Sequence, residues 1–463
     1  MRRTIIWVLY IIMGVQILLG CAYFITGFWA EQQFAENYVS IVPMGIISLV
    51  QLFLAAVSTW YFLGKLDFSE SREKKLLRGY ICAFLLTVPY LLQMHTAKLV
   101  WSLSLSCLLW MLGLLMEIMA QGYSKKRVLL LLGAYLLYGV ICPDGVWLGG
   151  ILLLFCSLYR RRGRRTGLGK EGQNRVGRET EGQKEAVQKC GAQVHFGRAA
   201  LVTAAAVILV NAGLNRAFPE ARRIYRENNL GTAAVSRFVW PNFASNYFFW
   251  DEEVKAVLSE EDAVRLCQRI DLLEREFYPE MVETYGTRKT TKLCLEMGYR
   301  CLMDRSRETV LEIGKDLRDY LLIPFTIENN LQGKGASLTG WNYGRMKAHT
   351  PTLVKYYFRY GTFELPILLL GSLLLWWFHR NEQIGQWMKR RTAQKDATMP
   401  FDKYGGGREK PAKWKLLCFM LVVYTLWYTM RSNLPIDYKL VLPILFIWYL
   451  ASVGGLLCQK PEN

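Results

Sequence analysis

The sequence predicts an all-α polytopic membrane protein with about ten transmembrane helices and a mainly helical external domain between the seventh and eighth spans. Three observations predict this fold class. Of the 463 residues, 52% are hydrophobic, and they gather into almost uncharged runs. The net charge of +19 is concentrated in short segments between those runs. One long polar region, 216–355, is nearly neutral. Together these observations exclude a soluble globular protein.

The apolar runs are the predicted spans, and several approach the length of about 20 residues that a helix needs to cross a bilayer. The first run follows Met1-Arg2-Arg3, which resembles the start of a signal peptide, but it is long and lacks a clear small-residue cleavage site. It is therefore predicted to be an uncleaved anchor. The predicted spans are 5–28, 43–64, 79–96, 99–122, 128–142, 146–159, 197–217, 357–378, 416–432 and 438–458.

The stretch 128–159 has two interpretations, because its two apolar halves flank Cys142-Pro143-Asp144-Gly145 and each half is short for a span. A single broken crossing would put one of its two flanking basic clusters outside. A hairpin keeps both Lys125-Lys126-Arg127 and Arg160-Arg161-Arg162 inside, as the positive-inside rule favours. We therefore expect a hairpin.

Charge then assigns each segment to a side of the membrane. With a hairpin at 128–159, the segments on the side of the two chain ends carry +20 and the remainder −1. This asymmetry predicts that both termini are cytoplasmic and that 218–355 is external, in the cell membrane. The basic residues thus report topology, and 160–198 lacks the interleaved aromatic residues of a nucleic-acid site. Membrane lipids are expected partners, and nucleic acid is not.

Composition divides the chain into modules. Residues 160–196 are rich in charged residues, Gly and Gln, so they are predicted to be a disordered basic linker, and 379–413 has a similar composition. The predicted modules are 1–159 (six spans), 160–196 (linker), 197–217 (seventh span), 218–355 (external domain), 356–378 (eighth span), 379–415 (basic cytoplasmic loop) and 416–463 (two spans and a short tail).

Apolar residues in the external region repeat at helical spacing. One predicted helix covers 259–277 with Ser259 as its N-cap, and a second amphipathic stretch carries Leu302, Val310, Ile313 and Leu317 on one side. The eleven cysteines include no CxxC pair and no Cys/His spacing of the zinc type, so no metal and no cofactor is predicted. A disulfide among the external Cys267, Cys294 and Cys301 stays open.

The predicted outer face holds the candidate chemistry, because ionisable groups near lipid are costly to keep without a purpose. The first outer loop, Trp29 to Val42, contains Glu31 and Glu36 and no basic residue. A buried carboxylate there could act as a general base toward an acceptor hydroxyl, so these are the candidate catalytic residues. The alternative is that acids are simply common on the outer side of a first hairpin.

The candidate substrate-binding residues lie in three further segments on the same predicted face. Asp144 sits at the hairpin tip, where a structural turn is the default interpretation. Two basic residues flank the turn between the last two spans, against the positive-inside trend, and would bind a lipid phosphate or form a network with the acid between them. Aromatic, basic and imidazole groups before the eighth span suit a polyol or phosphate, or a loop packed on the membrane. These residues are Arg431, Asp437, Lys439, Trp341, Arg345 and His349.

Three short motifs carry a resemblance to a known family. Leu85-Leu86-Thr87-Val88-Pro89-Tyr90-Leu91-Leu92 is similar to a third-span proline pattern, Cys142-Pro143-Asp144-Gly145-Val146-Trp147-Leu148 to a short hairpin, and Asp437-Tyr438-Lys439-Leu440-Val441-Leu442-Pro443 to an "R-Y-x-x-P" pattern that precedes a late span. With seven spans, an external domain and further spans, the chain resembles the GT-C superfamily of membrane glycosyltransferases, in particular members that use dolichyl-phosphate-mannose.

The resemblance implies an inverting transfer of a sugar from a polyprenyl-phosphate donor to a cell-envelope glycan, lipid or protein acceptor at the outer face, with an acid of the first loop as base. The family's first loop is usually longer and begins with Asp, whereas this loop offers Glu31 and Glu36. Two other function classes stay open. A transporter or flippase for a lipid-linked substrate would show broken helices or mid-membrane charges, and a non-catalytic scaffold would use the external domain to bind a partner.

Overall fold

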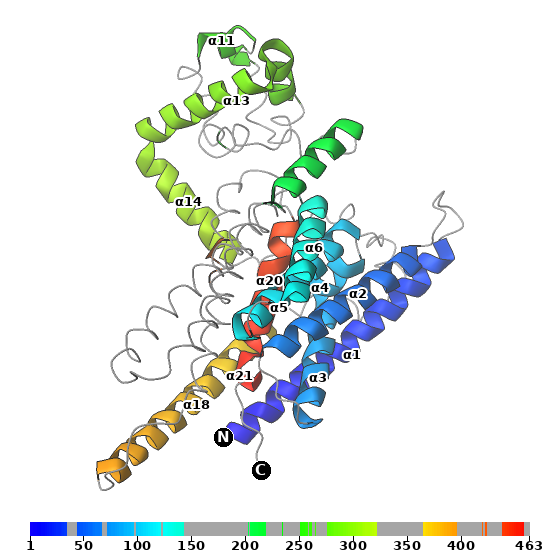
Figure 1. The fold of residues 1–463 in the computed structure, drawn as a ribbon, viewed down its shortest axis with the longest axis vertical. Helices are drawn as coiled ribbons and strands as arrows, with labels where there is room; N and C mark the ends of the chain where they lie inside the picture. The colour runs from blue at the N-terminus through cyan, green and yellow to red at the C-terminus, as the bar shows by residue number, and fades with distance from the viewer. Residues whose placement is uncertain are drawn as a thin grey trace, which may run out of the picture. The chain divides into compact units, whose positions relative to one another are not determined.

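The computed structural model describes residues 1–34, 44–66, 72–96, 99–121, 124–142, 202, 204–218, 234, 251–257, 259–261, 264, 276–321, 364–395, 419, 422–423 and 438–457. These residues are almost entirely helical, which confirms the all-α prediction at this level. The chain divides into two compact units (Figure 1), which are described separately. Unit 1 comprises 1–204, 324–420 and 442–463, and unit 2 comprises 205–323 and 421–441.

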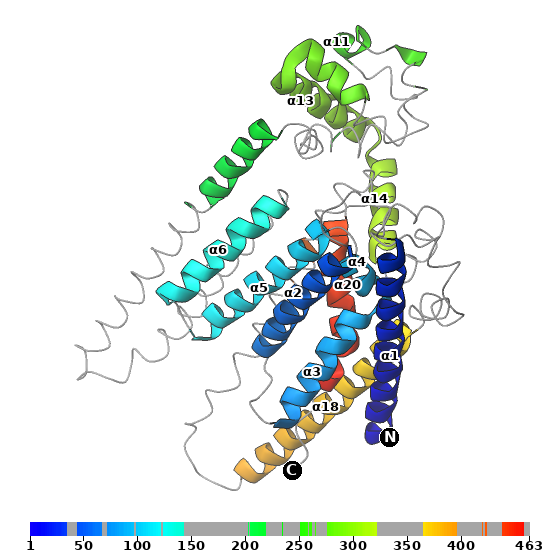
Figure 2. The same cartoon turned by 90° about the vertical axis from the view of Figure 1, so that its right-hand side faces the viewer.

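Unit 1 begins with six helices. α2 packs along α5, and α5 packs along α6, while α1 contacts α3 and α18, as Figures 1 and 2 show from two directions. Small polar side chains lie among the buried residues of α2 and α5 (Ser48, Ser58, Ser102, Ser104 and Ser106), and such residues let apolar helices approach closely. The helices are α1 (Arg2–Phe34), α2 (Met44–Lys65), α3 (Arg72–Thr87), α4 (Pro89–Thr96), α5 (Leu99–Gln121) and α6 (Lys125–Ile141).

The third predicted span is interrupted at Val88, between α3 and α4. Proline explains the break, because Pro89 has no N–H to give to the Leu85 carbonyl and its ring would clash with that carbonyl in a straight helix. The helical path resumes immediately, since the Val88 N–H donates to Phe84 and the Leu92 N–H donates to the Val88 carbonyl. The break therefore bends the path without ending it.

α1 lies close to this break. A Cβ on Gly20 would lie 2.5 Å from the carbonyl oxygen of Thr87, so only glycine permits this approach. The side-chain amide of Gln16, one turn earlier in α1, donates to the same carbonyl at 3.3 Å. Gln16 is buried, and its Oε1 has no hydrogen-bond partner in the described part of the chain. A buried polar amide therefore accompanies the break.

Unit 1 also contains α18 (Glu364–Lys395), α21 (Gly454–Leu457) and, from residue 442 onward, α20 (Tyr438–Ser452). The Ser372 hydroxyl of α18 donates to the Ser452 carbonyl and accepts from the Gly455 N–H at 3.2 Å. A Cβ on Gly455 would lie 2.6 Å from the Ser372 carbonyl oxygen. Glycine and serine thus bring the backbones of α18 and α21 into direct contact.

Unit 2 contains residues 205–217 of the helical segment 204–217, and further along the chain α11 (Glu252–Lys255), α13 (Tyr278–Asp304) and α14 (Ser306–Leu321). α13 has a kink at Gly286, where φ is 76°, a conformation that glycine adopts readily. Polar contacts fix α11 to α13. Arg300 forms an ion pair with Asp251 at 2.9 Å, Lys289 pairs with Glu253 at 2.8 Å, and the Tyr285 hydroxyl donates to the Glu253 carbonyl.

The structure corrects several predicted boundaries. α1 continues as far as Phe34, so Trp29 to Phe34 is helix where the sequence predicted an outer loop. α18 continues to Lys395, so the first 17 residues of the predicted linker 379–413 are helical. Neither extension contains Pro, and both contain strong helix formers: Ala, Glu and Gln in 29–34, and Glu, Gln, Lys and Arg in 379–395. This composition explains why the helices continue. On α14, Val310 is exposed, although the sequence placed it on an apolar face.

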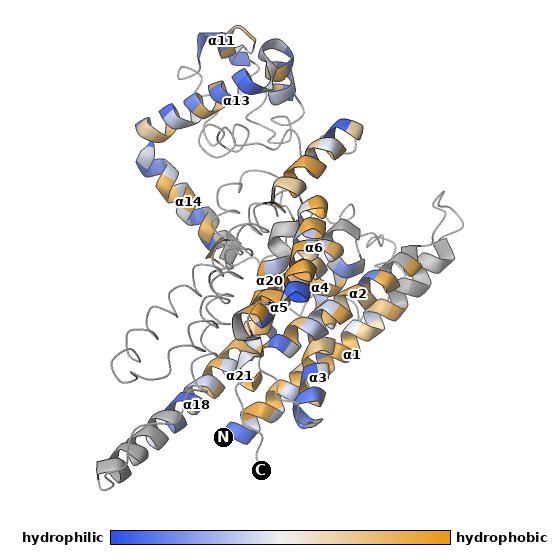
Figure 3. Ribbon diagram, viewed as in Figure 1, coloured by the Kyte–Doolittle hydropathy of each residue, from blue (hydrophilic) through white to orange (hydrophobic). Residues whose placement is uncertain are grey.

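The helices differ in hydropathy (Figure 3). α1, α2, α5, α6 and α20 are predominantly hydrophobic, whereas α3, α11, α13 and α14 mix hydrophobic and hydrophilic residues. By length and composition, Arg2–Ile25 of α1 is the one described helix that is long and apolar enough to cross a membrane. Shorter apolar helices cover Ser102–Ile118, Ala204–Ala217 and Pro443–Ser452. The prediction of ten spans stays a prediction.

Candidate functional site

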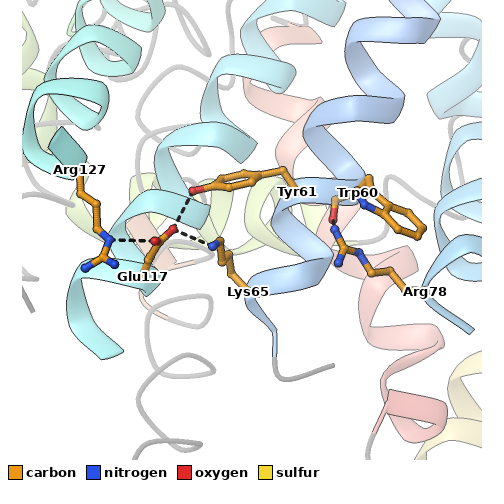
Figure 4. Close-up of polar contacts among 6 residues, drawn as sticks. All are labelled: Trp60, Tyr61, Lys65, Arg78, Glu117 and Arg127. Atoms are coloured by element: carbon orange, nitrogen blue, oxygen red, sulfur yellow. Dashed lines mark hydrogen bonds and ion pairs between the residues drawn. The ribbon is translucent and has the colours of Figure 1, made fainter. Parts of the chain in front are cut away.

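Three helices of unit 1 meet at a polar group that we call the Glu117 cluster and define as Tyr61 and Lys65 of α2, Glu117 of α5 and Arg127 of α6 (Figure 4). Tyr61 reaches α5 because Gly113 leaves room for its ring. A Cβ at Gly113 would lie 2.6 Å from the ring. The Tyr61 ring also stacks on Trp110, with 4.4 Å between ring centroids. Packing therefore fixes the position of the Tyr61 hydroxyl.

Glu117 is the common acceptor of this cluster. Its carboxylate lies 2.7 Å from the Lys65 ammonium and 2.8 Å from Nε of Arg127, and it accepts a hydrogen bond from the Tyr61 hydroxyl at 3.2 Å. Figure 4 shows the three donors approaching from two helices on either side of α5. Charge-assisted hydrogen bonds of this kind are stronger than neutral ones. One acid therefore ties together the ends of three helices.

Arg78 of α3 occupies the other flank of α2. Its guanidinium lies over the Trp60 ring, 4.0 Å from the ring centroid, and donates to the Trp60 backbone carbonyl (Figure 4). Gly64 again provides the space, because a Cβ there would lie 2.6 Å from the guanidinium. Cation–π contact and a carbonyl acceptor thus hold Arg78 on Trp60, away from Glu117.

The arrangement limits the chemistry of the cluster. All the donors around Glu117 stabilise a carboxylate, so this acid is a partner for cations and is poorly placed to remove a proton from a substrate. The described residues contain no group of three or more His, Cys, Asp or Glu side chains that could hold a metal ion. What the cluster offers a ligand is positive charge, since Lys65 and Arg127 outnumber Glu117.

Most of the residues predicted to form the site lie outside the described residues: Glu36, Asp144, Trp341, Arg345, His349, Arg431 and Asp437. For two of the predicted site residues, the structure describes the backbone only. Glu31 lies in the last turn of α1, three residues before Phe34, and Lys439 lies in the first turn of α20. The predicted helix at 259–277 is also largely outside the described residues. The assignments of these residues stay predictions.

Sequence reasoning did not single out the Glu117 cluster as a site. A signal for it exists, because Glu117 is an acid at the end of the apolar run 99–122 and lies shortly before Lys125-Lys126-Arg127. An acid and a cation on consecutive antiparallel helices of a hairpin can meet. Lys65 and Tyr61 could not be added in this way, because their contact with α5 depends on the packing of α2.

Comparisons with known proteins give no relative for this chain: no family model, no curated protein and no solved structure matches it.

Proposed function

We propose that this protein is an integral membrane glycosyltransferase that transfers a sugar from a polyprenyl-phosphate donor to a cell-envelope acceptor at the outer face of the cell membrane. In this proposal both termini are cytoplasmic and 218–355 is external. The proposal rests on the three motifs that resemble the GT-C superfamily and on the distribution of charge along the chain.

Exposed apolar faces support the membrane location. On α1, Trp7, Ile11, Val15 and Leu18 follow one another at helical spacing, and each is exposed. Ile367, Leu370 and Leu373 form a similar row on α18. In water such rows would be costly, whereas lipid chains would cover them. The buried serines of α2 and α5 lie among apolar side chains inside the same bundle, and small residues of this kind are common where transmembrane helices pack closely.

The single structural observation that best supports a glycosyltransferase is the helix break at Val88. It falls inside Leu85 to Leu92, the motif that is similar to the family's third-span proline pattern. The buried amide of Gln16 binds the Thr87 carbonyl beside it. In membrane proteins, non-helical backbone inside a span is found where it is buried in protein or lines a cavity. We infer that the break at Val88 marks such a place.

The proposed roles follow the sequence. Glu31 and Glu36 are the candidate general bases, and Arg431 and Lys439 are the candidate phosphate ligands, with Asp437 between them. Glu31 stays compatible with this role although it is helical, because it lies in the last turn of α1, next to the remainder of the predicted outer loop. Asp144, Trp341, Arg345 and His349 are the proposed sugar or acceptor contacts.

The test is transfer of radiolabelled sugar from a panel of polyprenyl-phosphate sugars by the full-length protein in lipid vesicles. We expect Glu31→Gln or Glu36→Gln to lower the rate by about 10²–10⁴-fold, the usual contribution of a general base. Glu73→Gln is the matched control, because Glu73 is an exposed acid in the first turn of α3 on the predicted cytoplasmic side. It should leave the rate unchanged.

Three results would contradict the proposal in different ways. Equal activity of both variants and wild type would refute the base assignment. Absence of turnover and of binding for every donor would favour the scaffold. Movement of an intact lipid-linked sugar between leaflets, without transfer, would favour a flippase, for which the break at Val88 is the relevant observation.

A further inference from the structure

Positive charge is in excess around the Glu117 cluster. Lys125 and Lys126 precede Arg127 at the start of α6, and both are exposed. No ion pair joins either of them to an acid in the described part of the chain. Glu117 can balance only one of its two own cations. This end of α2, α5 and α6 is therefore suited to a ligand that carries negative charge.

The exposed face of α6 continues from these cations as an apolar surface. Lys125, Leu129, Gly133 and Leu137 follow one another at intervals of four residues, so they share one face, and all four are exposed. A Cβ added at Gly133 would meet nothing within 4 Å. The opposite face of α6 holds its buried residues, including Leu131 and Tyr135. The exposed face thus combines a basic end with an apolar length.

The dimensions of this face match one leaflet of a bilayer. Twelve residues separate Lys125 from Leu137, which corresponds to about 18 Å of helix at 1.5 Å per residue. Half of a hydrocarbon core measures about 15 Å. A free phosphate ion would use only the basic end, whereas a phospholipid would use both its headgroup and its acyl chains. The contiguity of the two surfaces therefore favours a phospholipid.

We propose that this end of α2, α5 and α6 binds the anionic headgroup of a phospholipid such as phosphatidylglycerol from the inner leaflet. Lys125 and Lys126 contact the phosphate, with Lys65 and Arg127 held nearby by Glu117, and the acyl chains lie along Leu129, Gly133 and Leu137. Arg78 is outside this site because it is held on Trp60 (Figure 4). The proposal rests on the membrane location in the proposed function, but not on sugar transfer.

The experiment is native mass spectrometry of the full-length protein in a neutral detergent, titrated with phosphatidylglycerol or with phosphatidylcholine of identical acyl chains. The wild-type protein should bind phosphatidylglycerol at least tenfold more tightly than it binds phosphatidylcholine. The double variant Lys125→Gln/Lys126→Gln should weaken phosphatidylglycerol binding by roughly tenfold to thirtyfold, because each basic residue beside an anionic lipid contributes a severalfold factor. Its binding of phosphatidylcholine should not change.

The matched control is Lys74→Gln/Lys75→Gln. These lysines lie in the first turn of α3, on the same predicted side of the membrane as Lys125 and Lys126. The substitution removes the same amount of charge, but from another helix. The control should bind phosphatidylglycerol as wild type does. An equal loss in both double variants would overturn the proposal in favour of a diffuse attraction to basic surface, and equal affinity of wild type for the two lipids would also overturn it. Neither result would depend on whether the protein transfers sugar.

Discussion

The ammonium group of Lys65, the last residue of α2, lies 2.7 Å from the carboxylate of Glu117 on α5. Arg127 of α6 approaches the same carboxylate at 2.8 Å. Only 15% of the Glu117 side chain is exposed, against 28% for Lys65 and 27% for Arg127. Water therefore reaches the two cations better than the acid that holds them together.

The first prediction concerns this acid. Glu117→Gln keeps the size of the side chain but leaves Lys65 and Arg127 without their counter-charge. We expect the protein to lose about 1–3 kcal/mol of stability, less than for a fully buried pair because both cations retain some water. The measurement is thermal unfolding in detergent. Glu252→Gln is the control, since its side chain is 90% exposed and its pair with Lys255 should contribute almost nothing. Equal melting temperatures would contradict the prediction.

The second prediction compares two glycines. Gly455→Ala would place a methyl group 2.6 Å from the Ser372 carbonyl oxygen, so α18 and α21 must separate, at a cost of about 1–3 kcal/mol. Gly133→Ala meets nothing within 4 Å, and alanine favours a helix over glycine by about 1 kcal/mol. Thermal unfolding should thus shift in opposite directions for these two substitutions. A raised melting temperature for Gly455→Ala would show that α18 and α21 do not pack as described, and a lowered one for Gly133→Ala would show that the space beside Gly133 is filled.

The third prediction concerns the attachment of α11 to α13. Arg300→Met removes the ion-pair partner of Asp251, whose carboxylate lies 2.9 Å from the guanidinium. Asp251 is partly buried, and its Oδ2 already lacks a hydrogen bond. We expect a loss of about 1 kcal/mol and faster amide hydrogen exchange at 252–256. Lys292→Met is the control, because its pair with Glu296 is longer, at 3.6 Å, and well exposed. Unchanged exchange at 252–256 would mean that Arg300 does not hold α11.

The fourth prediction concerns the thiols of α13. Burial raises the pKa of Cys294 to about 12 and the pKa of Cys301 to about 11. The folded protein at pH 8 should therefore react with maleimide at Cys294 at least about a hundredfold more slowly than the unfolded chain, where a thiol pKa is about 8.5. Peptide mass spectrometry after labelling measures this rate.

The same two thiols predict how stability depends on pH. The folded protein holds their protons more tightly than the unfolded chain does, so their contribution is constant below about pH 8 and stability falls as the pH rises above about 9. Cys294→Ala should reduce that fall. Fast labelling of the folded protein at pH 8 would contradict the described burial.

A disulfide between Cys294 and Cys301 is excluded within α13, because seven residues of helix separate them by about 10 Å.

The helices that follow uniform apolar runs could be predicted closely from the sequence. The structure places α2 at Met44–Lys65 and α5 at Leu99–Gln121, within one residue of the predicted segments 43–64 and 99–122. Pro43 and Lys65 bound the first run in the sequence, and Lys98 and Gly122 bound the second. The predicted C-terminal ends of α1 and α18 were wrong, because they were placed where the apolar residues end. Charged helix formers such as Glu382 and Lys395 extend a helix without lengthening its apolar run.

The Glu117 cluster shows what the sequence leaves undetermined. The charge pattern could suggest the contact between Glu117 and Arg127, which are ten residues apart. It could not suggest Tyr61, because that contact needs the space above Gly113 and the packing of α2 on α5. The predicted catalytic acids depend on still longer relationships, between loops separated by hundreds of residues, and their assignment stays a prediction.

Two aromatic contacts in unit 1 join segments of the chain that the ribosome synthesises at very different times. The Phe62 ring of α2 packs edge-on against Phe446 of α20, with 5.8 Å between centroids, and Phe84 of α3 packs in the same way against Tyr449, at 6.3 Å. A ribosome must add more than three hundred residues between the members of each pair. During translation, the Phe62 and Phe84 rings therefore lack their partners on α20 until all of 205–323 has been synthesised. A chain stopped before Phe446 should be a preferred target for quality-control proteases, even though α2, α5 and α6 can already pack together.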